Sequence, residues 1–312
     1  MIPAPIVIFA YRRPEHLRRT LFSLMRCEGF DDSPVIIYGD GPKTTEEVEG
    51  VDATQRLARE MLGSVAEYHF SNTNKGLSQS IIDGVTEVIR RFGRAIVIED
   101  DLLLTSDFLT YMNAALDRYA NNHEVFQVSG YMFDVPEFAE RRNVLFLPFT
   151  VSWGWATWER AWDHFDVLAK GWDRLLIDNA LRYKFDIDGT YGYSTMLVRQ
   201  MMGRQDSWAV RWYWSAFQNS ALTVFPPRTL VINIGLDGTG SHGRGILRNF
   251  SCDRAEQLVG EVDFPRNVSI DECDSMIIKK SLRKANGRWL GRAVDYLRWI
   301  AAKNLLRIRR AQ

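Results

Sequence analysis

The chain has 312 residues, and 46% of them are hydrophobic, which excludes a disordered protein and allows a large core. Its 39 basic and 39 acidic side chains balance, so the composition does not indicate a nucleic-acid-binding protein. The charges are, however, unevenly distributed along the chain. From Lys279 onward there are eleven Lys or Arg and one acid, which leaves a net charge of −10 on the preceding residues.

The cysteines and the apolar runs restrict the cellular compartment in which we expect the protein. Cys27, Cys252 and Cys273 form no CxxC or His-spaced pattern, so neither a disulfide framework nor a zinc site is expected. The apolar residues 2–10 follow no basic residue and are too short for a signal peptide, and no run approaches ~18 apolar residues. We expect a cytoplasmic protein, with the inner face of the membrane as a further location.

The first hundred residues alternate between strand-like and helix-like segments. Apolar runs at 5–9, 35–38 and 96–98 predict strands, a further strand is expected around 66–70, and residues 14–25, 46–62 and 77–92 predict helices between them. This order is typical of a parallel, Rossmann-like sheet. Beyond residue 126 we expect strands at 146–151, 222–225 and 230–234 and helices at 158–165 and within 175–202. One catalytic domain over residues 1–250 and a basic, helical extension over 251–312 fit this pattern.

Three acids, Glu99, Asp100 and Asp101, follow the fourth strand. Thr105 and Ser106 then provide N-cap residue types for a helix over 108–119. The acids therefore lie at the carboxyl end of a strand, on an exposed turn, where open α/β sheets bind ligands. Their hard oxygen atoms suit Mg²⁺ or Mn²⁺. The alternative is a solvated acidic turn at the start of the helix.

Polar groups also follow the other three strands. Arg12 and Arg13 come after the first, Asp40 after the second, and Asn74, Lys75 and Gly76 after the third. An Asp can accept a hydrogen bond from a base, Arg and Lys can bind phosphate, and Gly allows a close backbone approach. The carboxyl ends of parallel strands meet at one edge, so these groups predict a ligand site there.

Two further segments have two interpretations each. Gly238 to Gly243 matches GxGxxG, but too little chain follows for a dinucleotide fold, so we interpret it as a flexible loop that brings His242 to a ligand. The alternative is a structural histidine in a turn. Asp206, flanked by aromatic residues, is either a general base or, with Ser207, an N-cap residue type before a helix over 208–220. Nucleophile-elbow, zinc-protease and P-loop motifs are absent.

Taken together, these motifs resemble glycosyltransferases of the GT-A fold, which use nucleotide-sugar donors. Residues 9–17 are similar to the family-2 opening, although Arg12 stands where Asn is usual, and residues 74–76 match its Asn-x-Gly element. Residues 99–101, the segment 205–208 and the Ser-His-Gly loop 241–243 are similar to the N-acetylglucosaminyltransferase I type. Residues 152–158 and 207–243 are similar to bacterial polysaccharide-locus transferases.

The resemblance implies a mixed, mainly parallel sheet flanked by helices and an inverting, Mn²⁺- or Mg²⁺-dependent transfer from a nucleotide sugar to a glycan or lipid-linked acceptor. It assigns the metal to Asp101 and His242, the base role to Asp206, and acceptor or sugar contacts to Trp153 and Trp155. The implied nucleotide-sugar residues are Ala10, Arg12, Arg13, Asp40, Asn74, Lys75, Gly76, Glu99 and Asp100. Two alternatives remain open: a degenerate domain that binds without turnover, and a nucleotidyltransferase, whose N-terminal glycine-rich loop is absent here.

The basic tail also has two interpretations. Leu290, Val294, Leu297, Ala301, Leu305 and Ile308 recur at helical spacing among basic residues. A basic amphipathic helix can lie on an anionic membrane, or the helix can pack on the acidic domain.

Overall fold

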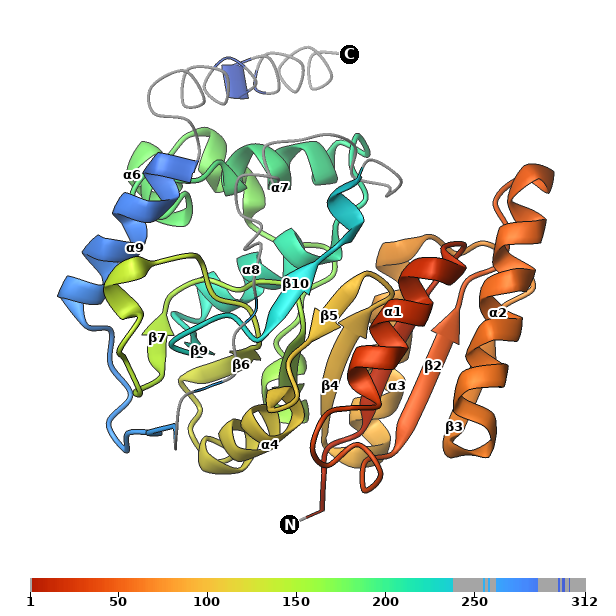
Figure 1. The fold of residues 1–312 in the computed structure, drawn as a ribbon. Helices are drawn as coiled ribbons and strands as arrows, with labels where there is room; N and C mark the ends of the chain where they lie inside the picture. The colour runs from red at the N-terminus through yellow and green to blue at the C-terminus, as the bar shows by residue number, and fades with distance from the viewer. Residues whose placement is uncertain are drawn as a thin grey trace, which may run out of the picture.

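The computed structural model describes residues 2–237, 255, 258, 262–285, 297, 299, 300 and 303. Its centre is an eight-stranded sheet in the order β3-β2-β1-β4-β8-β6-β9-β7 (Figure 1). The strands of this sheet are β1 (Ile6–Ala10), β2 (Val35–Gly39), β3 (Ala66–Phe70), β4 (Arg94–Glu99), β6 (Val125–Ser129), β7 (Leu145–Leu147), β8 (Trp155–Trp158) and β9 (Leu222–Phe225). A small second sheet pairs β5 (Leu102–Leu104) with β10 (Val231–Asn233).

The helices lie between the strands and after them. They are α1 (Pro14–Leu24), α2 (Val48–Leu62), α3 (Leu77–Phe92), α4 (Phe108–Arg118), α5 (Glu159–Trp162), α6 (Asn179–Phe185), α7 (Tyr193–Met201), α8 (Trp208–Gln218) and α9 (Glu272–Ala285). Short 3-10 turns are η1 (Thr45–Glu47), η2 (Gly63–Val65), η3 (Pro136–Phe138), η4 (Trp172–Leu176) and η5 (Gly235–Asp237). No helix in the described part of the chain is long and apolar enough to cross a membrane.

The first four strands of the sheet are parallel, as the sequence predicts. β1 lies between β2 and β4, with Ile8 opposite both Ile37 and Ile98. The direction then changes, because β8 runs antiparallel to β4 and β6, and β7 runs antiparallel to β9. The predicted fold class, a mixed and mainly parallel sheet flanked by helices, is confirmed.

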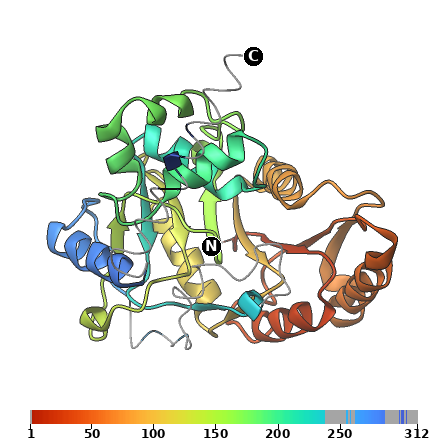
Figure 2. The ribbon, with the colours of Figure 1, turned by 90° about the horizontal axis from the view of Figure 1, so that it is seen from above.

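Alternate residues of the parallel strands face two separate cores. Ile6 and Ile8 pack with α1, α2 and α4, whereas Val7 and Phe9 pack with α3, α5 and α8. Figure 2, seen from above, shows α1 and α3 on opposite sides of the strands. Because both faces of β1, β2 and β4 are covered, these three strands are mainly apolar, which made them recognisable in the sequence, whereas the edge strand β3 carries Glu67 and His69 and is not buried.

Several predicted elements differ from the structure. The strand expected over 146–151 ends at Leu147, and β6, which is buried along its whole length, was not predicted. The helical stretch 175–202 is divided into α6 and α7, with Ile187, Asp188 and Gly189 between them at positive φ. The N-cap of α4 is Asp107 rather than Thr105 or Ser106, because the first hydrogen bond of the helix runs from the amide of Tyr111 to the carbonyl of Asp107.

The described residues of the C-terminal extension contact the domain. In α9, Ile278 and Leu282 join an apolar cluster with α6, α7 and β7, and Lys279 pairs with Asp188 at 2.6 Å. The ring of Trp299 is buried in the same cluster, with the guanidinium of Arg182 4.7 Å from its centre. At these positions the extension packs on the domain.

Candidate functional site

The loops after β1 and β4 meet at the carboxyl edge of the sheet, and Asp100 joins them. Its carboxylate accepts a hydrogen bond from the amide of Tyr11 at 3.2 Å and from Nη2 of Arg13. Its carbonyl accepts from the hydroxyl of Thr20 in α1 at 2.8 Å. Asp100 is buried and fully engaged, so it fixes the position of the loop that follows β1.

Asp101, the predicted metal ligand, is more enclosed than expected. Its side chain is 13% exposed, and its Oδ2 accepts from Nη2 of Arg13 at 2.7 Å. Its carbonyl accepts from the amide of Ile234, and a Cβ on Gly235 would lie 2.0 Å from Oδ2. The expectation of an exposed turn is therefore wrong, because the pairing of β5 with β10 brings residues 234 and 235 over this carboxylate.

Glu99 adds a third carboxylate to this cluster. Burial raises its pKa to about 8, and the charges of Asp101 and Asp100 act in the same direction, whereas Arg13 opposes them. The pKa of Asp100 is also raised, mainly by burial. With all three acids ionised, one guanidinium would face three carboxylates, an excess of two negative charges.

This excess and the hard oxygen donors fit a divalent cation. The side chains of Glu99, Asp100 and Asp101 nevertheless do not converge as a set of three ligands. Among the described residues, three ligand atoms lie within 4.8 Å of one another only in Glu67, His69 and Glu87. Asp100 is used by the loop after β1, and the raised pKa of Glu99 keeps its carboxyl group protonated at neutral pH, so the carboxylate of Asp101 is the one left for direct coordination.

The cluster of Glu67, His69 and Glu87 lies on β3 and α3, outside the predicted site. Two nitrogens of Arg91 already bond both oxygens of Glu67, at 2.9 and 2.8 Å. These hydrogen bonds lower the pKa of Glu67 to about 2. The positive charge that pairs with this cluster is therefore the guanidinium of Arg91.

Asp40 organises the loop that precedes α3. Its carboxylate accepts hydrogen bonds from the backbone amides of Gly41 at 3.0 Å, Lys75 at 2.8 and 3.1 Å, and Gly76 at 2.8 Å. The side chain of Asn74 donates to the carbonyl of Gly41 at 2.8 Å. The structure therefore brings Asp40 together with residues 74–76, as predicted, and its carboxylate supports their backbone.

The side chain of Asp206 contacts the start of α3 and does not cap α8, the helix that follows it in the chain. Its Oδ2 accepts from the amide of Ser78 at 3.4 Å, and a Cβ on Gly76 would lie 3.3 Å from the same atom. The N-cap of α8 is Ser207, whose hydroxyl accepts from the amide of Val210. Capping of α8 is thus assigned to Ser207, and Asp206 is an exposed carboxylate beside the loop 74–76.

Arg12 and Arg13 point to different partners. Arg12 is 46% exposed on its side chain and pairs with Glu47 at 3.3 Å. Glu47 also accepts from the hydroxyl of Tyr11, and burial together with this bond raises the pKa of Tyr11 to about 12. Only Arg13 reaches the acidic cluster. Ala10, the last residue of β1, is buried beneath both.

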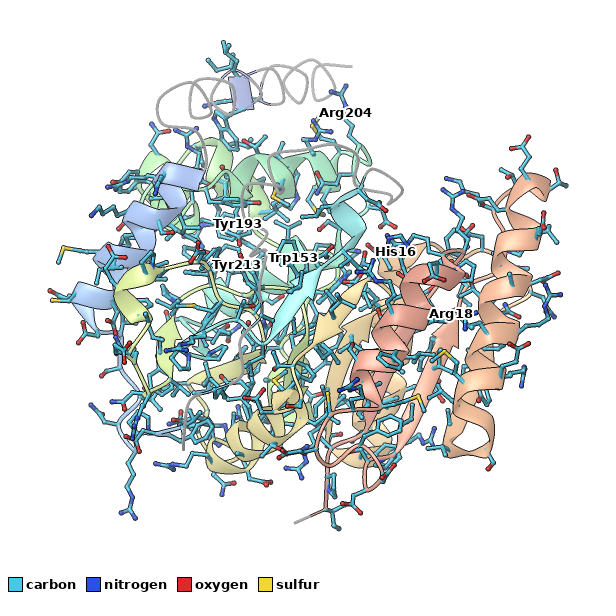
Figure 3. The ribbon with its side chains drawn as sticks, in the orientation of Figure 1. His16, Arg18, Trp153, Tyr193, Arg204 and Tyr213 are labelled. Atoms are coloured by element: carbon cyan, nitrogen blue, oxygen red, sulfur yellow. The ribbon has the colours of Figure 1, made fainter. Side chains whose placement is uncertain are left out.

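The two tryptophans predicted for acceptor or sugar contacts are in different environments. Trp155 is 1% exposed and stacks on Trp208 at 4.9 Å, so it is a core residue with no ring face for a ligand. Trp153 is partly buried and meets the ring of Tyr131 edge to face at 4.8 Å. Figure 3 labels Trp153 next to β10. Trp153 alone keeps surface that a ligand could contact.

His242 lies outside the described residues, so its predicted contact with metal is not placed. The structure instead adds His16 of α1, whose Nε2 lies 3.1 Å from a carboxylate oxygen of Asp237 in η5 (Figure 3). This contact joins the start of α1 to the segment that covers Asp101. His16 lies within the motif of residues 9–17, but its contact with Asp237 was not predicted, because this partner is distant in the chain.

No protein-family model matches the chain, and no curated protein matches it. Solved structures with some likeness include the mannosyltransferase PcManGT from Pyrobaculum calidifontis in complex with GDP-Man and Mn²⁺, with 16% identity over 50% of this chain and a TM-score of 0.35. GalNAc-T7 with UDP, GalNAc and Mn²⁺ has 9% identity over 72% of this chain and a TM-score of 0.44. TarS of S. aureus has 10% identity over 74% and a TM-score of 0.41.

The chain spans 45%, 43% and 61% of the lengths of these three structures, respectively. At such identities and TM-scores, the likeness assigns no activity to the present chain.

Proposed function

We propose that the chain is an inverting, metal-dependent glycosyltransferase that moves a sugar from a nucleotide-sugar donor to a glycan or lipid-linked acceptor hydroxyl, in bacterial surface polysaccharide synthesis. The observation that carries the proposal is the cluster of Glu99, Asp100 and Asp101 at the carboxyl edge of the sheet, where three carboxyl groups lie around the single guanidinium of Arg13. The order of the sequence motifs, which resembles that of GT-A glycosyltransferases, is the reason for proposing glycosyl transfer as the reaction. Mn²⁺ or Mg²⁺ would be shared between these carboxylates and the diphosphate of the donor, and its charge would offset both.

Each residue of the site then has a role. Asp101 would hold the cation, which stabilises the charge that develops on the departing nucleoside diphosphate. The loop 74–76, supported by Asp40, lies at the same edge and would contact the nucleotide. Glu99 would contact the ribose side, and Asp100, whose carboxylate is bonded to Tyr11 and Arg13, would keep Asp101 in place.

Asp206 would accept the proton of the acceptor hydroxyl. Its carboxylate is exposed, makes one hydrogen bond of 3.4 Å at the start of α3, and is not needed to cap α8. A base must reach the proton that it removes, and a lightly held, exposed carboxylate allows this approach. Trp153 is the remaining aromatic candidate for the acceptor side.

The metal role is tested by calorimetric titration of UDP and GDP with and without Mn²⁺. Asp101→Asn, which removes the charge and keeps the shape, should abolish Mn²⁺-dependent binding. The matched control Asp52→Asn, on the exposed face of α2, should bind as the wild type does. Unchanged Mn²⁺-dependent affinity in Asp101→Asn would exclude this metal site.

The base role is tested with the donor that this titration identifies. Asp206→Asn should lower turnover by ~10²–10⁴-fold with donor affinity nearly unchanged. Ser207→Ala is the control, because it alters the cap of the same helix and should keep turnover within a few-fold. NMR of the anomeric linkage in the product tests inversion. Donor binding without turnover in the wild type would favour a degenerate binding domain instead.

Peripheral membrane association of the basic tail remains a proposal. Trp299 packs on the domain and is only 5% exposed, whereas Leu297 is 65% exposed. A packed tail can therefore still present an apolar side chain outward. Co-sedimentation with anionic vesicles tests this: the full chain should bind at low salt and dissociate as salt rises, and a chain that ends at Asp274 should not bind.

A further inference from the structure

Arg13 occupies the position at which a cation is expected. One nitrogen, Nη2, donates to Asp100 and also to Oδ2 of Asp101, the latter at 2.7 Å. The side chain is 18% exposed, so water screens these ion pairs only in part. Among the described residues, the guanidinium of Arg13 is therefore the positive charge that pairs with the acidic cluster.

The other terminal nitrogen of Arg13 is not used. Nη1 is buried and has no hydrogen-bond partner among the described residues. A Cβ on Gly235 would lie 2.8 Å from Nη1 and 2.0 Å from Oδ2 of Asp101, so the backbone at 235 closes tightly over both groups. A buried donor without an acceptor is unfavourable, and an anion placed beside it would relieve this cost.

The two carboxylates hold Arg13 in unequal ways. Asp100 is also bonded to the amide of Tyr11, so its position is set independently of Arg13. Asp101 has no other side-chain partner among the described residues, and its contact with Nη2 is therefore the one that a divalent cation must break. The guanidinium can retain Asp100 while it releases Asp101.

We infer that Arg13 is a built-in counter-ion that competes with the divalent cation for Asp101, and that it makes cation binding depend on the nucleoside diphosphate. The inference rests on the proposed function. A cation alone must displace Arg13 and lie close to its positive charge. A diphosphate that arrives with the cation accepts hydrogen bonds from the released guanidinium, including Nη1, so the two ligands bind more tightly together than separately.

The test measures Mn²⁺ affinity directly, by electron paramagnetic resonance of free Mn²⁺, with no ligand and with saturating UDP or GDP. In the wild type, Mn²⁺ alone should bind weakly, and the nucleotide should raise its affinity at least ~10-fold. Arg13→Gln should raise the affinity for Mn²⁺ alone at least ~10-fold and reduce the enhancement by nucleotide. Arg18→Gln is the matched control, since Arg18 lies on the exposed surface of α1 and pairs only weakly with Glu15 at 3.5 Å, and it should leave both values within about twofold.

Arg13→Lys serves as a second variant if the neutral one does not fold. A lysine keeps the charge but cannot present the guanidinium to both carboxylates, so the affinity for Mn²⁺ alone should rise by a smaller factor. An increase in affinity cannot arise from unfolding. Equal or weaker Mn²⁺ binding in a folded Arg13 variant, with wild-type binding intact, would overturn this inference and leave the proposed function standing. Absence of Mn²⁺ binding from every variant, with or without nucleotide, would overturn both.

Discussion

Replacement of Glu99 by Gln should make the protein more stable at high pH and change little at low pH. Glu99 lies beside Asp100 and Asp101 in the acidic cluster, and burial raises its pKa to about 8 from the ordinary 4.5. The neutral amide has nearly the shape of the carboxyl group but cannot ionise. The free energy of unfolding of the variant therefore lacks the contribution from this titration.

The sign follows from proton binding in the two states. Between pH 4.5 and about pH 8, the folded chain keeps the Glu99 proton that the unfolded chain has lost. Rising pH therefore favours unfolding across this interval. Below pH 4.5 Glu99 is protonated in both the folded and the unfolded state. Above pH 8 it is ionised in both states, and the loss of unfolding free energy is then complete. At 1.36 kcal/mol per pH unit, the interval corresponds to an upper limit of about 5 kcal/mol.

The assay is urea denaturation of both proteins at pH 5, 7 and 9 without divalent cations. From pH 5 to pH 9 the stability of Glu99→Gln relative to the wild type should grow by up to about 4 kcal/mol, with the wild-type fold kept at all three values. Glu60→Gln, which removes the same charge from the exposed surface of α2, should show no such trend. A difference between Glu99→Gln and wild type that stays within about 1 kcal/mol from pH 5 to pH 9 would refute the reasoning.

Further expectations follow from the same contacts. Asp40→Ala should lower the free energy of unfolding by about 2–4 kcal/mol in urea, because three backbone amides lose a charged acceptor and water can replace it in part. Gly235→Ala should weaken Mn²⁺-dependent nucleotide binding at least ~10-fold in calorimetry, since its Cβ would lie 2.0 Å from Asp101. Ser207→Ala should cost about 1 kcal/mol of unfolding free energy through the lost cap of α8, whereas Asp206→Ala should not lower stability through that cap.

Much of the parallel half could be predicted from the sequence. The strand over residues 66–70 and the helix over 77–92 have the expected bounds, and the other early elements differ by a few residues. The strands β1, β2 and β4 are covered on both faces, so they are mainly apolar runs between polar turns and are visible locally. The meeting of Asp40 with residues 74–76 also follows from parallel strands, whose carboxyl ends share one edge.

The environment of each site residue was decided by the tertiary structure. The pairing of β5 with β10 joins segments far apart in the sequence and places Gly235 over Asp101. Long-range packing likewise buries Trp155 against Trp208 and brings Asp206 to the start of α3. Local periodicity tells which face of an element is apolar, but it does not tell which distant segment will cover that face. Exposure, charge balance and the partner of Arg13 depend on that distant segment, so only the folded chain determines them.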